Sequence, residues 1–280
     1  MKAKILVGIV VFFIVGLVLG IFIASYTGVT STLFSRTSGS TGSLLEKIKS
    51  RGKLIVGTSA DWPPYEYVTP DGGFAGIDIA LAKKIAEALE VQLEIKDMKF
   101  AALFEAVKRG DVDIVIADVD MNPERLKVID FSIPYRCESG KAIVIREDDA
   151  STYTGYDWLR GRKIGVQLGT TEQDLANQYF GNTSEIITFD RVYPEMTMAL
   201  KSGHIDAMIV APNVAKIITT KEEGLKIIDH LPFFSCSAVV IPKGADDLKV
   251  FVSEVIWHLK ESGELDKIIE KEVAKWLKTD

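Results

Sequence analysis

The feature that most constrains the fold is one pattern that occurs twice along the chain. The two segments read "EAVKRGDVDIVIAD" and "TMALKSGHIDAMIVAP". Each joins a helical stretch, a glycine, an aspartate three residues later and an apolar strand, with Gly110 and Asp113 in the first copy and Gly203 and Asp206 in the second. Because the unit occurs twice only, it predicts two lobes of similar build and not a solenoid.

Around these units, predicted strands alternate with predicted helices. Short apolar or alternating runs predict strands at 53–59, 91–98, 112–118 and 162–167. Apolar residues at helical spacing predict helices at 44–50, 76–90, 100–110, 172–180 and 246–278, the last with a break near Gly263. This alternation predicts an α/β fold with mostly parallel sheets that are covered on both faces.

The N-terminus predicts export. Lys2 and Lys4 precede 20 apolar residues, Ile5 to Ala24, the length that spans a bilayer. The run is longer than a usual signal-peptide core and no A-x-A site follows, so an uncleaved anchor over 1–24 is favoured over a cleaved signal. The lysines should stay inside, which makes the remainder extracytoplasmic. Residues 25–43 are rich in Ser, Thr and Gly and predict a flexible tether.

Charge and cysteine content narrow the function further. The net charge of −6 argues against nucleic acid as a partner, since nucleic acid selects basic surfaces. In an exported chain the two cysteines, Cys137 and Cys236, permit one disulfide. Two unpaired buried thiols are the alternative that the residues alone leave open.

Two carboxylates mark a candidate site. The strand at 112–118 runs into Asp118 and Asp120, and Arg125 follows. In open α/β sheets ligands bind beyond the carboxyl ends of strands. A hard-metal site needs more oxygen ligands, and glycosidase carboxylates usually come from separate elements. The three histidines lie far apart in the sequence, and no nucleophile or metal motif occurs. The pattern favours binding over catalysis, with no metal or cofactor.

Further residues fit a binding site. "DWPPYEY" places Trp62 and Tyr65 directly after a strand, and aromatic faces beside carboxylates suit a ligand with a cationic or flat apolar part. The guanidinium of Arg125 can donate two parallel hydrogen bonds to a carboxylate. Thr170 and Thr171 stand at a predicted helix start, where free N–H groups suit an anion. The alternatives are packing under a loop for the aromatic residues, a helix cap for the aspartates and a surface ion pair for Arg125.

Several segments together resemble a known family. They include "GKLIVGTSADWPPYEY", "GGFAGIDIALAKKIAEAL", "NPERLKVIDFSIPY" and "LRGRKIGVQLGTTEQ". From about Lys53 to Lys275 the chain resembles extracytoplasmic solute-binding proteins, family 3, which serve ABC transporters of polar amino acids. The resemblance implies a two-lobed periplasmic-binding-protein fold (type II). Each lobe would be a doubly wound, mostly parallel sheet, and two hinge strands would join lobe 1, 44–136 plus 237–280, to lobe 2, 141–232.

The resemblance also implies a binding site. Trp62 and Phe100 would sandwich the ligand side chain. Arg125 would bind the α-carboxylate, helped by N–H groups near Thr170 and Thr171. We also expect Ser59, Asp61 and Tyr65 to face the ligand.

The chain departs from the family pattern at three positions. Ala211 stands where the family usually has the aspartate that holds the α-ammonium, Ser59 where it often has Asp, and Asp120 where it often has Ser or Thr. Our hypothesis is that Asp118 and Asp120 take over recognition of an ammonium or guanidinium group, which favours a basic amino acid, or else a related cationic nitrogenous compound. Asp120 is expected to weaken the α-carboxylate site or to pair with Arg125.

The same alignment places Cys137 and Cys236 at the two hinge crossings, where a disulfide would steady the hinge. The implied function is capture without chemistry by a monomer that delivers its small-molecule ligand to an ABC permease. The alternatives are the ligand-sensing input module of a signalling system and a lyase on the same fold, which would need a general acid such as Glu172 or one of the two aspartates.

Overall fold

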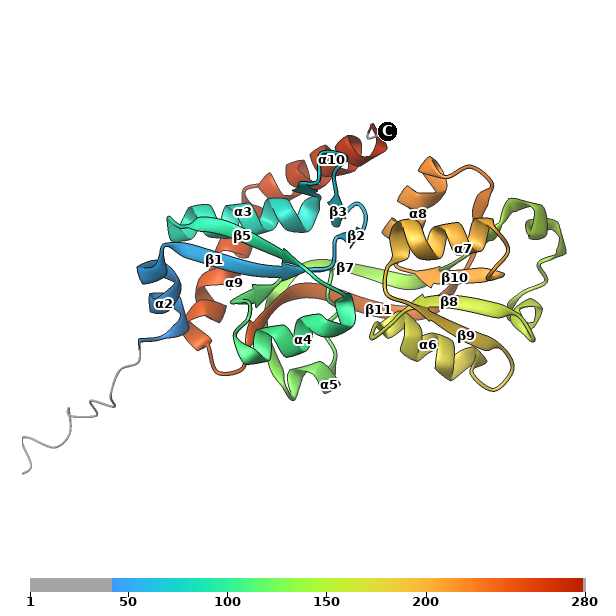
Figure 1. Cartoon of the computed structure of the whole chain (residues 1–280), viewed down its shortest axis with the longest axis horizontal. Coiled ribbons are helices and arrows are strands. Elements are labelled where there is room, and N and C mark those ends of the chain that lie inside the picture. Colours follow the sequence, from blue (N-terminus) through green and yellow to red (C-terminus); the bar gives the residue numbers. More distant parts are fainter. Residues whose placement is uncertain (1–41, 279–280) are drawn as a thin grey trace, which may run out of the picture. The chain divides into compact units, whose positions relative to one another are not determined.

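The computed structural model describes residues 42–278 (Figure 1). The predicted anchor, 1–24, and all but the last two residues of the predicted tether lie outside them. Among the residues described, no helix combines the length and the apolarity needed to cross a membrane. The anchor and the tether therefore stay predictions.

One eight-stranded sheet contains the parallel strands of both lobes, in the order β5-β1-β6-β11-β7-β10-β8-β9. Its strands are β1 (Lys53–Thr58), β5 (Gln92–Asp97), β6 (Ile114–Val115), β7 (Ile129–Arg146), β8 (Lys163–Gln167), β9 (Glu185–Phe189), β10 (Ala207–Val210) and β11 (Leu225–Pro242). β1 is parallel to β5 and β6, and β8 is parallel to β9 and β10. β7 and β11 are antiparallel to their neighbours. The predicted parallel strands are thus present in both lobes.

The two long strands β7 and β11 join the lobes. They pair with each other from Arg146 opposite Leu225 to Ile129 opposite Pro242, so both pass from one lobe to the other. Cys137 lies directly opposite Cys236 in this pairing, and the two sulfurs form a disulfide 1.99 Å long. The bridge therefore ties the two hinge strands to each other where they cross between the lobes.

Helices cover both faces of the sheet in each lobe (Figure 1). The first lobe contains α2 (Leu44–Arg51), α3 (Ile77–Leu89), α4 (Phe100–Arg109), α5 (Pro123–Leu126), α9 (Asp246–Glu261) and α10 (Glu264–Leu277). The second contains η2 (Glu147–Thr152), η3 (Tyr156–Leu159), α6 (Thr171–Phe180), η4 (Val192–Met196), α7 (Thr197–Lys201) and α8 (Pro212–Lys221). A small antiparallel sheet of β2 (Asp61–Trp62), β3 (Glu66–Val68) and β4 (Phe74–Ala75) completes the first lobe.

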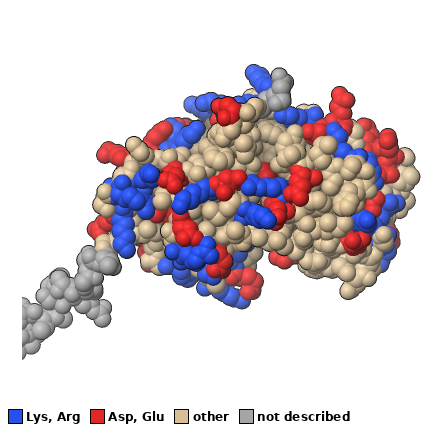
Figure 2. Space-filling view, viewed as in Figure 1, with Lys and Arg blue, Asp and Glu red and all other residues tan. Residues whose placement is uncertain are grey.

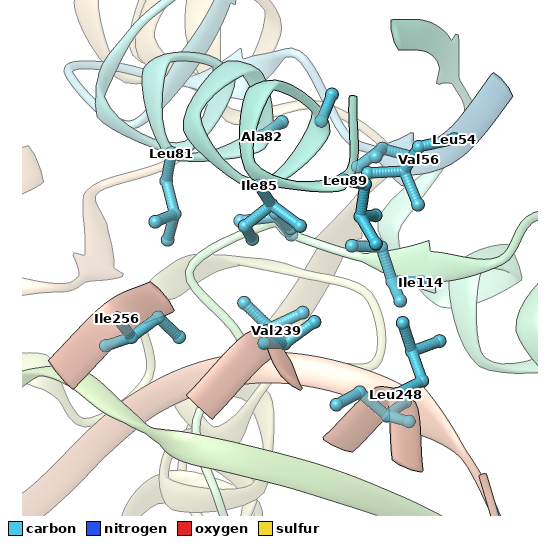
Figure 3. Packing of buried hydrophobic residues seen from close by; sticks show 14 of the residues in the cluster. Leu54, Val56, Leu81, Ala82, Ile85, Leu89, Ile114, Val239, Leu248 and Ile256 are labelled. Carbon is cyan, nitrogen blue, oxygen red and sulfur yellow. The ribbon is translucent and has the colours of Figure 1, made fainter. Parts of the chain in front are cut away.

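The core of the first lobe shows why the helical spacing matters. Leu81, Ile85 and Leu89 of α3 are four residues apart, so they share one helix face, and all three are buried in the same cluster. Figure 3 shows this face packed toward Val239 of β11 and Ile256 of α9. Burial of each such side chain contributes about 1.5–3 kcal/mol.

The repeated glycine and aspartate have the same role in both lobes. Gly110 and Gly203 each follow a helix with a φ of +77°, a conformation that glycine adopts without strain. Asp113 accepts a hydrogen bond from a main-chain N–H of β1 (2.7 Å), and Asp206 accepts one from the first residue of β8 (2.9 Å). Each aspartate thus fastens its own strand to the neighbouring parallel strand.

The predicted strand at 112–118 is shorter in the structure. Only Ile114 and Val115 pair within the sheet, although the segment remains buried to Asp118. Asp118 has a φ of +43°, which turns the chain away from the sheet, and its main-chain N–H donates to Asp78 Oδ2 (2.7 Å). This turn directs the following residues toward the second lobe.

Charged side chains of both signs are intermingled on the face of the molecule in Figure 2. Several charged side chains form i,i+3 pairs along helices, such as Lys108 with Glu105. Exposed pairs of this kind contribute little to stability, about 0–1 kcal/mol each. Several of the buried charges, which matter more, line the cavity between the lobes.

Candidate ligand-binding site

A small cavity of about 20 Å³ lies between the lobes beside β7. Side chains of both lobes line it. Seven of the ten residues predicted to bind ligand are among them: Trp62, Phe100, Asp118, Asp120, Arg125, Thr170 and Thr171. The lining also includes Glu66, Lys141 and Glu172, which were not among the predicted binding residues. The structure therefore brings most of the predicted site together.

Two aromatic side chains supply the apolar walls. Trp62 comes from β2, and Phe100 is the first residue of α4. Both are 7% exposed. The indole Nε1–H of Trp62 donates to Asp118 Oδ2 (3.0 Å), which fixes the ring against one wall. The pair is arranged to contact the faces of a flat or cationic ligand group.

Arg125 is a half-buried cation without an anionic partner among residues 42–278. Its Nη1 donates to the main-chain oxygen of Asp120 (2.6 Å) and its Nη2 to that of Gly169 (3.1 Å), across the lobes. The guanidinium carbon lies 4.9 Å from the centre of the Phe104 ring. No carboxylate forms an ion pair with Arg125 anywhere in the stretch 42–278. Burial lowers the pKa of Arg125, so an anion arriving at this site would relieve the penalty of burying its charge.

Asp120 does not pair with Arg125, contrary to one sequence-based expectation. Its Oδ2 accepts hydrogen bonds from Lys141 Nζ (2.7 Å) and from Thr171 Oγ1 (2.5 Å), because the chain after β6 directs this carboxylate toward the hinge strand. Burial opposes ionisation of Asp120, but Lys141 and these hydrogen bonds outweigh it and lower its pKa. Asp120 Oδ1 is buried and receives no hydrogen bond from a described residue. One oxygen therefore remains available.

Lys141 was missed by the sequence reasoning. It lies on β7, is 1% exposed and places Nζ 2.7 Å from Asp120 Oδ2 and 2.8 Å from Glu172 Oε1. Burial lowers its pKa, but the two carboxylates raise it more, and the net shift is upward. The available signal was a lysine inside the otherwise apolar stretch "KAIVI". One buried cation between two carboxylates leaves this part of the cavity with a formal negative charge.

Asp118 also forms an ion pair with a cation of the chain, Arg136. Arg136 approaches both of its oxygens, with Nη2 2.6 Å from each and Nε 3.0 Å from Oδ1. Arg136 also forms an ion pair with Glu138 (2.5 Å) and lies over the Tyr65 ring. In the structure, Asp118 and Asp120 therefore face two different cations, Arg136 and Lys141, and do not converge on one empty position.

The start of α6 supplies the second lobe's side of the cavity. Thr170 is the N-cap, and its hydroxyl accepts from the main-chain N–H of Gln173 (3.3 Å). Thr171 begins the helix, and its hydroxyl donates to Asp120. The positive end of the helix thus lies in the wall that also contains Arg125, which suits a carboxylate.

Three predicted residues lie outside the cavity lining. Asp61 Oδ2 accepts from Gln167 Nε2 (2.9 Å) and from the main-chain N–H of Val192 (2.5 Å), so it joins the lobes. Ser59 donates its hydroxyl to Asp61. Tyr65 is buried beside the cavity, and its hydroxyl accepts from an amide of the second lobe. Burial raises the pKa of Asp61 to about 6. These side chains hold the lobes together and do not face the empty volume.

Ion pairs at the edge of the cavity also connect the lobes. Arg191 donates to both oxygens of Asp97 (2.9 and 2.7 Å), and Lys99 pairs with Asp190 (2.5 Å). Such contacts require the lobes to be closed on each other. The structure is therefore a closed form, and it encloses a polar cavity with one unpaired cation, Arg125, among its described lining residues.

Comparison with known proteins identifies the family. A family model described as bacterial extracellular solute-binding proteins, family 3, matches residues 54–276. The L-cystine-binding protein TcyJ of Escherichia coli (strain K12) is 30% identical over 229 residues, which make up 81% of this chain and 85% of that protein.

Two solved structures share the fold. One is the amino acid ABC transporter substrate-binding protein AbpA from Streptococcus pneumoniae bound to L-arginine, with 36% identity and a TM-score of 0.78 over 83% of this chain and 99% of that one. The other is the ancestral amino acid-binding protein AncCDT-1, a precursor of cyclohexadienyl dehydratase, with 31% identity and a TM-score of 0.77 over 82% and 100%. They confirm the predicted two-lobed fold. Because the family match also spans most of the chain, the chain belongs to the bacterial extracellular solute-binding proteins, family 3.

Proposed function

We propose that this protein captures a polar amino acid outside the cytoplasm, with preference for a basic one, and delivers it to an ABC-type importer. Relatives that bind cystine and arginine support the amino-acid class, and the arginine-bound relative supports the basic preference. The proposal includes a monomer with lobes at 44–136 plus 237–280 and 141–232, and attachment to the membrane through 1–24.

Arg125 is the observation that carries the proposal. Its half-buried guanidinium donates, among the described residues, to main-chain oxygens only, so it has donor capacity and charge left for an anion. Thr171 and the N-terminus of α6 stand in the same wall. A ligand α-carboxylate placed there would interact with the side chain and with helix N–H groups together.

Asp120 is the proposed partner of the α-ammonium. The family's usual aspartate is replaced by Ala211, which is buried at the start of α8 and does not line the cavity. Asp120 lines it, and no hydrogen-bond donor among residues 42–278 binds its Oδ1. The acidic side chain at this site would therefore come from the other lobe. Lys141 pairs with Asp120 Oδ2, and the ligand's ammonium can bind Asp120 Oδ1.

The ligand side chain would extend between Trp62 and Phe100. A guanidinium or ammonium group gains about 0.5–2 kcal/mol from an aromatic face at such a buried position. Contacts with both lobes would stabilise the closed form by the ligand's differential affinity for closed and open states. An importer would then recognise the surface of the closed form, in which Arg191 is bound to Asp97.

The test is isothermal titration of the full-length chain in detergent against the amino acids, polyamines, betaines and small organic acids. We expect arginine or lysine to bind, and Arg125→Gln to weaken binding about 10- to 100-fold, the value of losing a charged hydrogen bond. Arg109→Gln, at an exposed position, is the control and should bind normally. Binding restricted to compounds without a carboxylate would refute the proposal.

Recovery of the ligand after binding separates capture from catalysis. The relation to a dehydratase precursor makes this measurement worthwhile. Asp120, whose pKa is lowered by Lys141 and its hydrogen bonds against the effect of burial, is poorly suited to donate a proton. We expect the ligand to be recovered unchanged, and turnover would favour the lyase alternative.

A further inference from the structure

The turn that joins α6 to β9 has the sequence Asn-Thr-Ser at 182–184. An asparagine followed two residues later by serine or threonine, with any residue but proline between them, is the acceptor pattern for N-linked glycans in exported proteins. The chain has four asparagines, and only Asn182 stands in this pattern. Because three residues often match by chance, the surroundings of Asn182 decide whether the match has a meaning.

The side chain of Asn182 is accessible. It is exposed and makes no hydrogen bond with any residue in the described stretch. Two of the other asparagines serve the fold, since Asn122 caps α5 and Asn213 donates to a tyrosine of the other lobe. The amide of Asn182 can therefore carry a bulky substituent without displacing a packed group.

Hydrogen bonds hold the turn in a defined shape. The carbonyl of Phe180 accepts from the main-chain N–H groups of Thr183 and Ser184 (2.8 Å each). The hydroxyl of Ser184 donates to the carbonyl of Leu159 at the end of η3 (2.8 Å). The serine of the pattern is thus engaged in the folded protein, so an enzyme that reads it must act before the turn folds against η3.

A hollow of about 290 Å³ lies beside the turn. Its lining is aromatic and polar: Tyr156, Asp157, Arg160, Tyr179, Phe180 and Thr183. The ring centre of Tyr179 is 6.2 Å from that of Tyr156 and 6.0 Å from that of Phe180, and Tyr179 is 39% exposed. Asp157 and Arg160 form an exposed ion pair. Aromatic rings bordered by charged groups suit a sugar, which has an apolar C–H face and a rim of hydroxyl groups.

The turn lies away from the cavity between the lobes. Thr171, at the start of α6, lines that cavity, and α6 has 10 residues, so the helix ends about 15 Å further along its axis. In Figure 1, α6 and β9 meet at the outer end of the second lobe. β9 is the last strand of the eight-stranded sheet, and no described strand pairs with its outer side. A substituent at this turn would leave the cavity open and shield a sheet edge that can otherwise pair with another chain.

We propose that Asn182 carries an N-linked glycan and that the first sugar of this glycan packs into the aromatic hollow. The co-reactant is an oligosaccharide held on a lipid phosphate, and the catalyst is a membrane-bound transferase that acts outside the cytoplasm. The amide nitrogen of Asn182 attacks the anomeric carbon of the sugar. The new C–N bond replaces the C–O bond to the phosphate, the lipid phosphate leaves, and the amide loses one proton to a base of the transferase. Modification of Asn182 requires export of the chain, which its extracellular family implies, and does not depend on the ligand.

The experiment is peptide mapping by mass spectrometry of the full-length protein, purified from the organism that makes it. We expect the peptide that contains Asn182 to be heavier than its sequence by a chain of sugars. Electron-transfer fragmentation, which keeps sugars attached, should place them on Asn182. Asn182→Gln and Ser184→Ala, expressed in the same cells, should lose this mass entirely. A peptide with the mass of its sequence alone, or sugar on another residue of that peptide, would overturn the proposal.

Two matched controls test the pattern. Asn177→Gln replaces an exposed asparagine on the last turn of α6, which is followed by Gln and Tyr and so lies outside the pattern. Thr183→Ala changes the middle residue, whose identity the pattern leaves open. Both variants should keep the glycan, and its loss in Asn177→Gln would show that Asn182 is not the acceptor. If a variant is not recovered from the cells, the peptide map of the unaltered chain still decides.

Thermal unfolding tests the hollow. If the sugar packs against the Tyr179 ring, removal of the glycan in Asn182→Gln should lower Tm by about 2–4 °C. In a Tyr179→Ala background, which lacks the ring, Asn182→Gln should change Tm by less than about 1 °C. Equal shifts in the two backgrounds would overturn the packing of the sugar in the hollow.

Discussion

Replacement of Lys141 tests whether the buried ion cluster was assigned correctly. Lys141→Met keeps the length of the side chain and removes its charge. Asp120 and Glu172, which lie 2.7 and 2.8 Å from Nζ, would then face each other in the closed structure without a cation. Removing one member of a buried ion pair destabilises a protein by about 3–5 kcal/mol, because the remaining charge is left desolvated.

The expected shift in the melting temperature follows from the size of the folded unit. Residues 42–278 should unfold with an entropy of about 0.5 kcal/mol per kelvin. A loss of about 3–5 kcal/mol therefore lowers Tm by about 6–10 °C, which calorimetry or circular dichroism resolves easily. Lys127→Met is the matched control: Lys127 is 65% exposed and pairs with Glu124, so we expect a change below about 2 °C.

The pH dependence makes the test specific. The folded pKa of Asp120 is lowered below the unfolded value of about 3.9, so its ion pair stabilises the protein fully above that pH and loses its effect as the pH falls through the folded pKa. The difference in Tm between the native chain and Lys141→Met should thus be largest near neutral pH and shrink below about pH 4. A difference below about 2 °C, or one independent of pH, would refute this account of the cluster.

Two further predictions follow from the hinge and from the edge of the cavity. Reduction of the Cys137–Cys236 bridge, or its replacement by serines, removes a link between residues 99 positions apart and should destabilise the protein by about 2–5 kcal/mol. Denaturant unfolding with and without reductant measures the difference. Equal unfolding midpoints would contradict this prediction. Arg191→Gln removes a pair with Asp97 that exists only in the closed form, so ligand affinity should fall about two- to fivefold while Tm without ligand changes little. An unchanged affinity would show that this pair does not contribute to closure.

Local signals in the sequence were sufficient for the long helices, for several parallel strands and for the two-lobed plan. Ser43 and Glu46 form a capping box at the start of α2, and Gly110 ends α4 in the conformation that glycine favours. Asp113 and Asp206 recur because each fastens a strand to its parallel neighbour. Such signals act over a few residues or repeat with a fixed period, so they can be read without knowing the fold.

The sequence also identified most of the cavity, since residues after strand ends and at helix starts gather at one edge of an α/β sheet. It did not reveal how their charges are balanced. Asp118 and Asp120 read as a pair that awaits a cation, but the structure provides each with its own, Arg136 and Lys141, which follow 18 and 21 residues later. That pairing depends on the hinge strand passing beside the cavity.

The contrast between what the sequence identified and what the structure revealed is clearest at Glu66. In the sequence it is the glutamate of "DWPPYEY", a segment that stands out only for its aromatic residues. Only the packing of β3 against α3 removes its carboxylate from water, and no donor among residues 42–278 binds either of its oxygens. Periodicity and motifs determined the architecture because they are local properties of the chain, whereas charge balance is a property of distances in space, which the tertiary structure alone decides.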